Sequence, residues 1–151
     1  AEPLRLLPLA RSTGTPFWVD VHDYDGRAHY HRPFLDAADA VFCNADRLDD
    51  PVVFLQSRIA AGARLAVCTL GAEGAVAVDE HGVVHRVPAV PVEVVDTNGA
   101  GDAFLAGVLD ARLDGAGVTT ALEAGARSAA AVLRTRHLHP LLDPVLGAVG
   151  R

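Results

Sequence analysis

The segment 94–107, VVDTNGAGDAFLAG, places two glycines and an alanine between two aspartates. Gly99 and Gly101 permit positive φ and let the backbone approach a ligand closely. Where such a loop leads into a helix, free N–H groups and the helix dipole form a site for a phosphate or a developing oxyanion. Asp102 follows in the first turn, where it can accept a proton from a hydroxyl that attacks a phosphoryl group. The alternative is an ordinary strand-to-helix turn in which Asp102 only starts the helix.

The elements that must position this loop alternate between strands and helices, which predicts an α/β layered domain with a mainly parallel sheet flanked by helices. Residues 3–11 are either the end of a helix or a loop with an apolar face. We expect strands over 16–22, 40–43, 64–71 and 92–95, a hairpin over 74–90 that turns at DEHG, and helices beginning at Phe34, over 51–63, from about Ala103, and over 119–137.

Several expected strands end in polar or glycine residues. In open α/β sheets, ligands bind beyond the carboxyl ends of the strands. If these ends converge on one edge of the sheet, they form a site there. The residues concerned are Asp20, Asn44, Gly71 and Asp96.

Composition limits the classes of partner. The chain has 151 residues, half of them hydrophobic, which suits a globular domain, and its net charge of −6 argues against nucleic acid or an anionic membrane as the main partner. Cys43 and Cys68 lie in apolar runs and are expected to be buried thiols, with a disulfide or a metal pair as the alternatives. No apolar run reaches the ~18 residues of a membrane helix, and the start lacks the features of a secretion signal. We therefore expect a cytoplasmic protein.

The stretch DTNGAGDAF, residues 96–104, resembles the C-terminal signature of the ribokinase, or PfkB-type carbohydrate kinase, family. The order of WVDVH, VFCNADRL, VCTLGAEGAVAV, this signature and an Ala-rich helix is also similar to that family over residues 16–137. The resemblance implies a ribokinase-like fold, of which residues 1–151 form a single partial domain, the C-terminal half without the lid. It also implies ATP-dependent phosphoryl transfer to a hydroxyl of a sugar, nucleoside or related small molecule, with ATP, Mg²⁺ and a monovalent cation such as K⁺ as cofactors.

The resemblance implies a role for each matching residue. Asp102 corresponds to the catalytic base, and the amides of Gly99, Ala100 and Gly101 correspond to the anion hole over the transferred phosphate. Asp96 and Asn98 occupy positions that help to hold a monovalent cation. The nucleotide-binding candidates are Asn44, Thr69, Gly71 and Gly74, although Gly71 also suits a plain strand-ending turn.

The chain departs from the family pattern in three places. The family carries Asn-x-x-Glu, whereas this chain has NADR, so Arg47 stands where Glu is expected and Asp46 is the adjacent substitute. The segment LRTRHLHPLLD lacks the usual glycine-bearing loop. Family members are about twice as long, and no methionine is present, so we expect a fragment that forms a homodimer or binds a partner that supplies the missing half.

Two alternatives remain open from the residues. One is a catalytically silent fragment, acting as a nucleotide-binding or assembly module that lacks the substrate half. The other is a metal site at His29 and His31 or at His137 and His139, which would face the same side if they lay on strands.

Overall fold

The computed structural model describes residues 2–136, which fold as two compact units. The first unit comprises the chain up to Gly71 together with Val76–His85, and the second comprises Ala72–Ala75 and the chain from Arg86 onward. Each unit is described by itself below.

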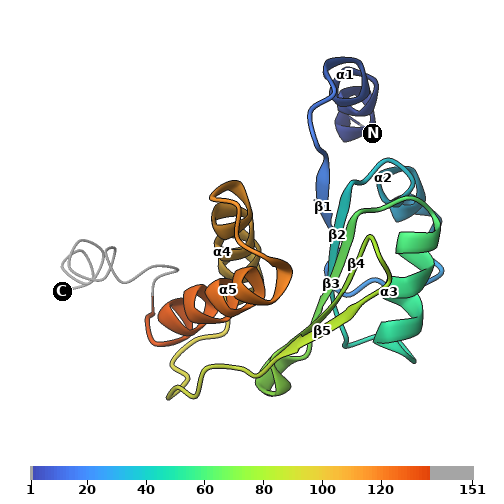
Figure 1. Cartoon of the computed structure of the whole chain (residues 1–151). Helices are drawn as coiled ribbons and strands as arrows, with labels where there is room; N and C mark the ends of the chain where they lie inside the picture. The colour runs from blue at the N-terminus through green and yellow to red at the C-terminus, as the bar shows by residue number, and fades with distance from the viewer. Residues whose placement is uncertain (1, 137–151) are drawn as a thin grey trace, which may run out of the picture. The chain divides into compact units, whose positions relative to one another are not determined.

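A five-stranded sheet with strand order β1-β2-β3-β4-β5 forms the centre of the fold (Figure 1). β1, β2 and β3 run parallel, and the connection between β4 and β5 is a four-residue hairpin, so the sheet is mixed. This confirms the expected α/β class. The strands are β1 Trp18–Asp20, β2 Ala40–Asn44, β3 Leu65–Thr69, β4 Ala75–Asp79 and β5 Val84–Val87.

The helices fall close to the segments expected from the sequence. In α3, the Asp50 side chain accepts a hydrogen bond from Val53 N at 3.1 Å, and Pro51 occupies the first helical position, where its missing N–H is harmless. The α-helices are α1 Leu6–Thr13, α2 Arg32–Leu35, α3 Pro51–Ala60, α4 Ala100–Leu113 and α5 Val118–Leu133, and short 3₁₀ helices cover Glu2–Arg5, His29–His31 and Gly71–Glu73.

The core of the first unit lies around β2, β3 and β4. The first four residues of each of these strands are buried, as expected for central strands covered on both faces. α3 packs against β3 and contributes Leu55, which is completely buried. The apolar run AVFC and the run LAVC are therefore strands because their side chains fill both faces of the sheet.

The strand expected over 92–95 is wrong. Val94 and Val95 are exposed, and the segment is a loop. Pro88 and Pro91 both precede it and supply no N–H to a strand ladder. The amides of Val95 and Asp96 instead donate to the carbonyl of Leu133 at 2.8 and 3.4 Å, which attaches the loop to the end of α5.

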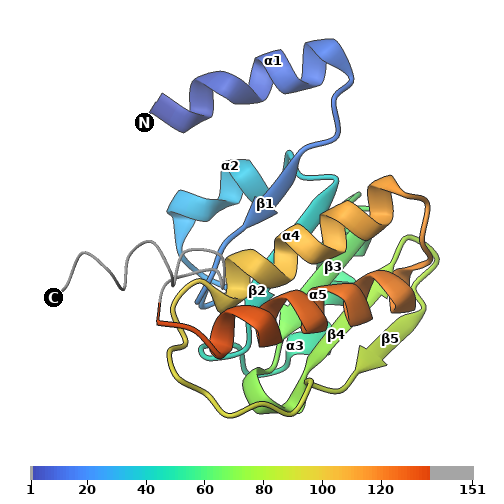
Figure 2. The ribbon, with the colours of Figure 1, turned by 90° about the vertical axis from the view of Figure 1, so that its left-hand side faces the viewer.

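α4 and α5 form a closely packed antiparallel hairpin in the second unit (Figure 2). Glycines allow the close approach: a Cβ on Gly125 would lie 2.7 Å from Val108 Cγ2 and 2.8 Å from Phe104 O. A Cβ on Gly107 would lie 3.0 Å from Gly125 Cα. This packing brings the first turn of α4 to the same end of the hairpin as the last turn of α5.

Candidate functional site

Three polar strand ends meet at one edge of the sheet in the first unit. Asn44 and Thr69 are register partners at the ends of β2 and β3, and Asp20 ends the adjacent β1. Gly71 follows β3 and begins a 3₁₀ helix. The expected convergence therefore holds for these residues. Asp96 does not end a strand and belongs to the second unit.

Three hydrogen bonds hold the turn that follows β2. Asn44 Oδ1 accepts from Asp46 N at 3.1 Å, and Ala45 N donates to Thr69 O at 3.1 Å. The Thr69 hydroxyl donates to Cys43 O at a long 3.5 Å. The side chains of Asn44 and Thr69 thus place polar atoms at the strand ends. Among the described residues, their hydrogen-bond partners are either close in sequence or at a long distance.

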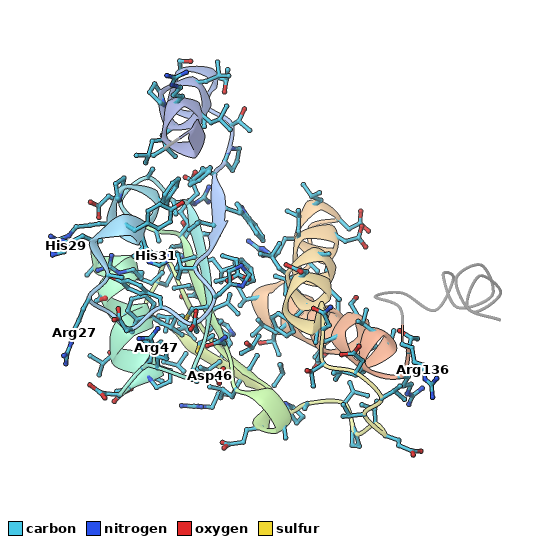
Figure 3. All side chains as sticks on the ribbon, turned by 180° about the vertical axis from the view of Figure 1, so that it is seen from behind. Arg27, His29, His31, Asp46, Arg47 and Arg136 are labelled. Atoms are coloured by element: carbon cyan, nitrogen blue, oxygen red, sulfur yellow. The ribbon has the colours of Figure 1, made fainter. Side chains whose placement is uncertain are left out.

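Arg47 extends from this turn toward an acidic loop of the same unit (Figure 3). Its guanidinium lies 3.5 Å from Asp23 Oδ2 and 3.9 Å from Asp25 Oδ2. Backbone hydrogen bonds from Arg27 and Ala28, aided by the Arg47 charge and opposed by a small burial effect, hold the pKa of Asp25 below its ordinary value. Arg47 therefore neutralises the 23–25 loop, a partnership that the spacing of DYD and R in the sequence does not reveal.

A second polar pair, on the β4–β5 hairpin, also escaped prediction. His85 Nε2 lies 3.0 Å from Asp79 Oδ2, while Asp79 Oδ1 accepts from His81 N and Val83 N, both at 2.9 Å. These interactions of Asp79, called the hairpin latch below, stabilise the turn that the sequence DEHG predicted. Because both residues belong to the hairpin, we assign the pair a structural role. In the sequence, only Asp79, which opens the DEHG turn, pointed to it.

In the glycine loop of the second unit, Gly99 adopts the positive φ that the sequence permits, whereas Gly101 is an ordinary helical residue. Gly99 lies in the left-handed region at φ 75° and is the N-cap of α4, which begins at Ala100 and not near Ala103. Ala103 N makes the first helical bond, to Gly99 O at 2.9 Å. The helix thus starts three residues earlier than expected because the left-handed Gly99 lets the chain turn directly into it.

Three amides at this turn have no acceptor among the described residues: those of Gly99, Gly101 and Asp102. Ala100 N differs, since it donates to Thr97 O at 3.3 Å. A Cβ built on Gly101 meets no atom within 4 Å, so the space beside these amides is open. Unpaired amides, the positive end of the helix dipole and open space together suit an anion.

Asp102 is exposed in the first turn of α4, where a negative charge is favourable. Asp96 Oδ1 accepts from Asn98 N at 2.9 Å, which closes the loop ahead of Gly99. The structure therefore brings Asp96, Asn98, the open amides and Asp102 into one short segment.

Gly71 and Gly74, the two remaining nucleotide-binding candidates, differ in how closely other atoms approach them. Gly71 has φ 58° and open space at its Cβ position. Gly74 has φ 100°, and a Cβ there would collide with Val87 O and lie 2.6 Å from Ala89 N. Close backbone packing therefore accounts for glycine at position 74 whether or not a nucleotide binds.

The histidine pair at 29 and 31 does not lie on a strand, as the metal hypothesis assumed, but in a 3₁₀ helix. The His31 ring packs against Tyr24 with ring centroids 5.1 Å apart. His137 and His139 lie outside the described residues. Within 2–136, no three potential metal ligands gather, and no helix is long and apolar enough to cross a membrane.

A cavity of about 240 Å³ lies in the first unit between α1 and the residues before β2. Leu7, Ala10, Phe17 and Asp39 line it, and Asp39 Oδ2 accepts from Phe17 N at 2.7 Å. No residue selected from the sequence lines this cavity. The cavity belongs to the first unit, whereas the glycine loop belongs to the second.

Comparison with known proteins places this architecture. The model of the pfkB family carbohydrate kinases matches residues 9–142. Acarbose 7(IV)-phosphotransferase of Actinoplanes sp. is 40% identical over 124 residues, which cover 80% of this chain and 40% of that protein. The structure of the microbiome-derived acarbose kinase Mak1 has a TM-score of 0.82 at 34% identity, covering 90% of this chain and 47% of that one.

A probable sugar kinase from Rhizobium etli is similar in structure over 97% of this chain and 48% of its own length, with a TM-score of 0.76 and 27% identity. The chain thus spans less than half the length of each of these proteins. The fold is that of the ribokinase-like kinases. The chain belongs to the pfkB family of carbohydrate kinases.

Proposed function

We propose that this chain supplies the nucleotide-binding and catalytic part of a kinase that transfers the γ-phosphoryl group of ATP to a hydroxyl of a sugar or related small molecule. The open first turn of α4 carries the proposal: it presents unpaired amides to an anion and a carboxylate in the same turn. Family membership supports phosphoryl transfer as the reaction. We further propose that DTNGAGD is the family signature and that the two units belong to one ribokinase-like domain, the C-terminal half of a longer kinase.

The chemistry needs little beyond placement and charge. The amides of Gly99, Gly101 and Asp102 hold the phosphoryl oxygens, and Ala100 joins them if its long bond to Thr97 opens. Asp102 accepts the proton of the acceptor hydroxyl as that oxygen bonds to phosphorus and the bond from phosphorus to the ADP oxygen breaks. Such fixed electrostatic placement supplies most of the catalysis in phosphoryl transfer.

The residues fit the cofactors of the family in different ways. Asn44, Thr69, Gly71 and Gly74 are proposed to contact the nucleotide. Mg²⁺ would be held mainly by the nucleotide's phosphates with one or two carboxylates, as this ion usually is in such sites. When bound, Mg²⁺ supplies charge neutralisation to these phosphates.

A monovalent cation has a separate candidate site. We propose that Asp96 and Asn98 supply oxygen ligands for it beside the anion turn, where the hydrogen bond between them fixes their loop. K⁺ is the cation to test.

Nucleotide binding is the first test. We expect ATP with Mg²⁺ to raise the melting temperature, because a ligand that binds only the folded state stabilises it. Gly101→Asp should abolish this shift, since the open space accepts the side chain but its charge repels phosphate. Gly117→Asp is the matched control, because Gly117 also has open space and is the N-cap of α5. Equal shifts in both variants would contradict binding at the α4 turn.

Phosphoryl transfer is the second test. Acarbose, fructose and adenosine form a suitable acceptor panel, since relatives named for sugar and nucleoside phosphorylation match this chain. Formation of a phosphorylated acceptor, detected by mass spectrometry, would support the kinase.

A nucleotide-binding or assembly module without activity is the second candidate function. The chain's coverage of less than half of its relatives favours it. Nucleotide binding without transfer to any acceptor in the panel would select this candidate, and transfer by the chain alone would exclude it.

A further inference from the structure

The two cysteines of the chain are partners in the central ladder of the sheet. Cys43 on β2 lies opposite Cys68 on β3, and both are free thiols. Register partners on parallel strands point to the same face, and neighbouring strands lie about 4.8 Å apart. That spacing falls within the Cα separations of about 4.4–6.8 Å that a disulfide spans. The backbone therefore already holds the pair at bridging distance.

The thiols also interact with each other. Cys43 Sγ lies 3.6 Å from Val67 O, and Cys68 Sγ lies 3.6 Å from Thr69 O. The interaction with the neighbouring Cys68 thiol, together with burial, raises the pKa of Cys43, whereas the interaction with Cys43 lowers the pKa of Cys68 against the effect of burial. Cys68 is therefore the thiol that ionises first, and the thiolate is the reactive form.

The position of the pair gives access to a small oxidant. Both cysteines are buried, at 4% and 0% exposure, but each is the second-to-last residue of its strand. Access therefore requires local opening of the core at this end of the sheet, and strand ends open more readily than strand centres. Hydrogen peroxide is uncharged and close to water in size, so this opening suffices for it.

We propose that Cys43 and Cys68 form a redox pair that peroxide closes into a reversible cross-strand disulfide. The Cys68 thiolate attacks a peroxide oxygen, the O–O bond breaks, and the departing hydroxide takes a proton to become water. The Cys43 sulfur then attacks the Cys68 sulfenic acid: the S–S bond forms, the S–O bond breaks, and the hydroxide leaves as water with the Cys43 proton. Two thiols are oxidised, and one peroxide is reduced to two waters.

Closure would change the strand ends that carry two candidate nucleotide contacts. Asn44 and Thr69 directly follow the cysteines. A disulfide brings the Cβ atoms to about 3.8 Å, closer than the strand spacing, so it draws these ends together. The hydrogen bond from Thr69 Oγ1 to Cys43 O also links the two strand ends, so their movement changes this bond. We therefore expect weaker nucleotide binding in the oxidised chain; this consequence, unlike the disulfide itself, rests on the proposed function.

Mass spectrometry tests the disulfide directly. The reduced wild-type chain is treated with increasing hydrogen peroxide, quenched with catalase, unfolded and alkylated with N-ethylmaleimide. We expect both alkylation sites to disappear together and to return after dithiothreitol. Trypsin cuts at Arg47, Arg58 and Arg64 between the cysteines, so the bridge should appear as two linked peptides.

Cys43→Ala and Cys68→Ala are the matched controls, since each leaves one thiol without its partner. Full alkylation of the oxidised wild type, separate oxidation of each cysteine, or bridges only between chains would each overturn the proposal. The ATP–Mg²⁺ melting shift of oxidised and reduced wild type then tests the consequence. An unchanged shift in the bridged chain would refute the effect on the site alone, and absence of a shift in the reduced chain would refute the proposed nucleotide site instead.

Discussion

In the proposed mechanism, Asp102 is the proton acceptor, so a change at one of its side-chain atoms should separate nucleotide binding from turnover. Asp102→Asn keeps the shape of the α4 turn and its open amides but removes the proton acceptor. We expect turnover in phosphoryl transfer to fall by about 10²–10⁴, the usual contribution of a general base, while the nucleotide-induced melting shift persists. Steady-state kinetics measures this, with Asp110→Asn on the exposed far end of the same helix as the control. Turnover within about tenfold of wild type would remove Asp102 from the proposed role.

Asp79 links stability to pH through the hairpin latch. Burial opposes ionisation, but the hydrogen bonds from His85, Val83 and His81 outweigh it and lower the pKa of Asp79 below 3.8. A carboxyl with a depressed folded-state pKa stabilises the fold above its unfolded pKa, and this stability is lost as the pH falls below 3.8.

Asp79→Ala should therefore lower the free energy of unfolding by about 0.5–1.5 kcal/mol at pH 7, because three donors of the hairpin turn lose their acceptor. It should also flatten the pH dependence below pH 3.8. Urea unfolding across pH measures both effects. Glu80→Ala in the same turn is the comparison, and an equal acid slope in wild type and Asp79→Ala would contradict the role of the latch.

Glycines set the geometry of individual elements, and two of them make a direct comparison. Gly71→Ala places a side chain in open space at positive φ and should cost about 1–2 kcal/mol of conformational strain. Gly74→Ala adds a collision with the backbone after β5, so we expect a total of about 2–5 kcal/mol. Thermal or urea unfolding ranks the variants. A smaller loss for Gly74→Ala than for Gly71→Ala would mean that the backbone approach seen here is not maintained.

The α4–α5 hairpin depends on its glycine contact. Gly125→Ala should lower the free energy of unfolding by about 1–3 kcal/mol, because Val108 and the carbonyl of Phe104 must move apart to admit the methyl group. The loop before Gly99 is attached to Leu133 O at the end of α5, so movement of α5 would disturb it. We therefore also expect a smaller increase in melting temperature with ATP and Mg²⁺. Glu123→Ala, at an exposed position of the same helix, is the control. An unchanged stability of Gly125→Ala would show that the helices separate without cost.

The elements show where sequence patterns suffice. Apolar runs such as AVFC and LAVC predicted buried strands correctly because both faces of a central strand are covered. The run over 92–95 failed because β-branched residues also occur in a loop whose amides bond to a distant helix end, a contact that no local pattern contains. The start of α4 was misplaced by three residues because Gly101, a poor helix former, lies inside the first turn of the helix.

For the candidate site, the sequence pointed to the segment 96–102 and to the strand ends Asn44 and Thr69, and their role in binding remains a prediction. It could not reveal that Ala100 N bonds to Thr97 while Asp102 N stays open, since that depends on the φ of Gly99. The partners of Arg47 and of Asp79 were also hidden, because they join residues through space.

At the scale of the whole molecule, the first unit leaves surfaces that a complete kinase or a second copy would cover. β1 has three residues and lies at the edge of the sheet with one neighbour (Figure 1). Unpaired strand edges promote association between chains. On the neighbouring α1, Leu7 is buried, whereas Leu6 and Leu9 are 61% and 60% exposed. These observations favour association of the chain through β1 and α1.

We therefore expect the isolated chain to form a homodimer through this surface. Leu6→Glu with Leu9→Glu should shift it toward monomer, because both charges would be buried in the contact. Light scattering coupled to size exclusion measures the mass, and Val53→Glu on α3, equally exposed at 61%, is the matched control. If the control dissociates the dimer as well, the contact lies elsewhere. A monodisperse wild-type monomer would contradict the prediction and show instead that the exposed leucines of α1 and the edge of β1 do not cause association.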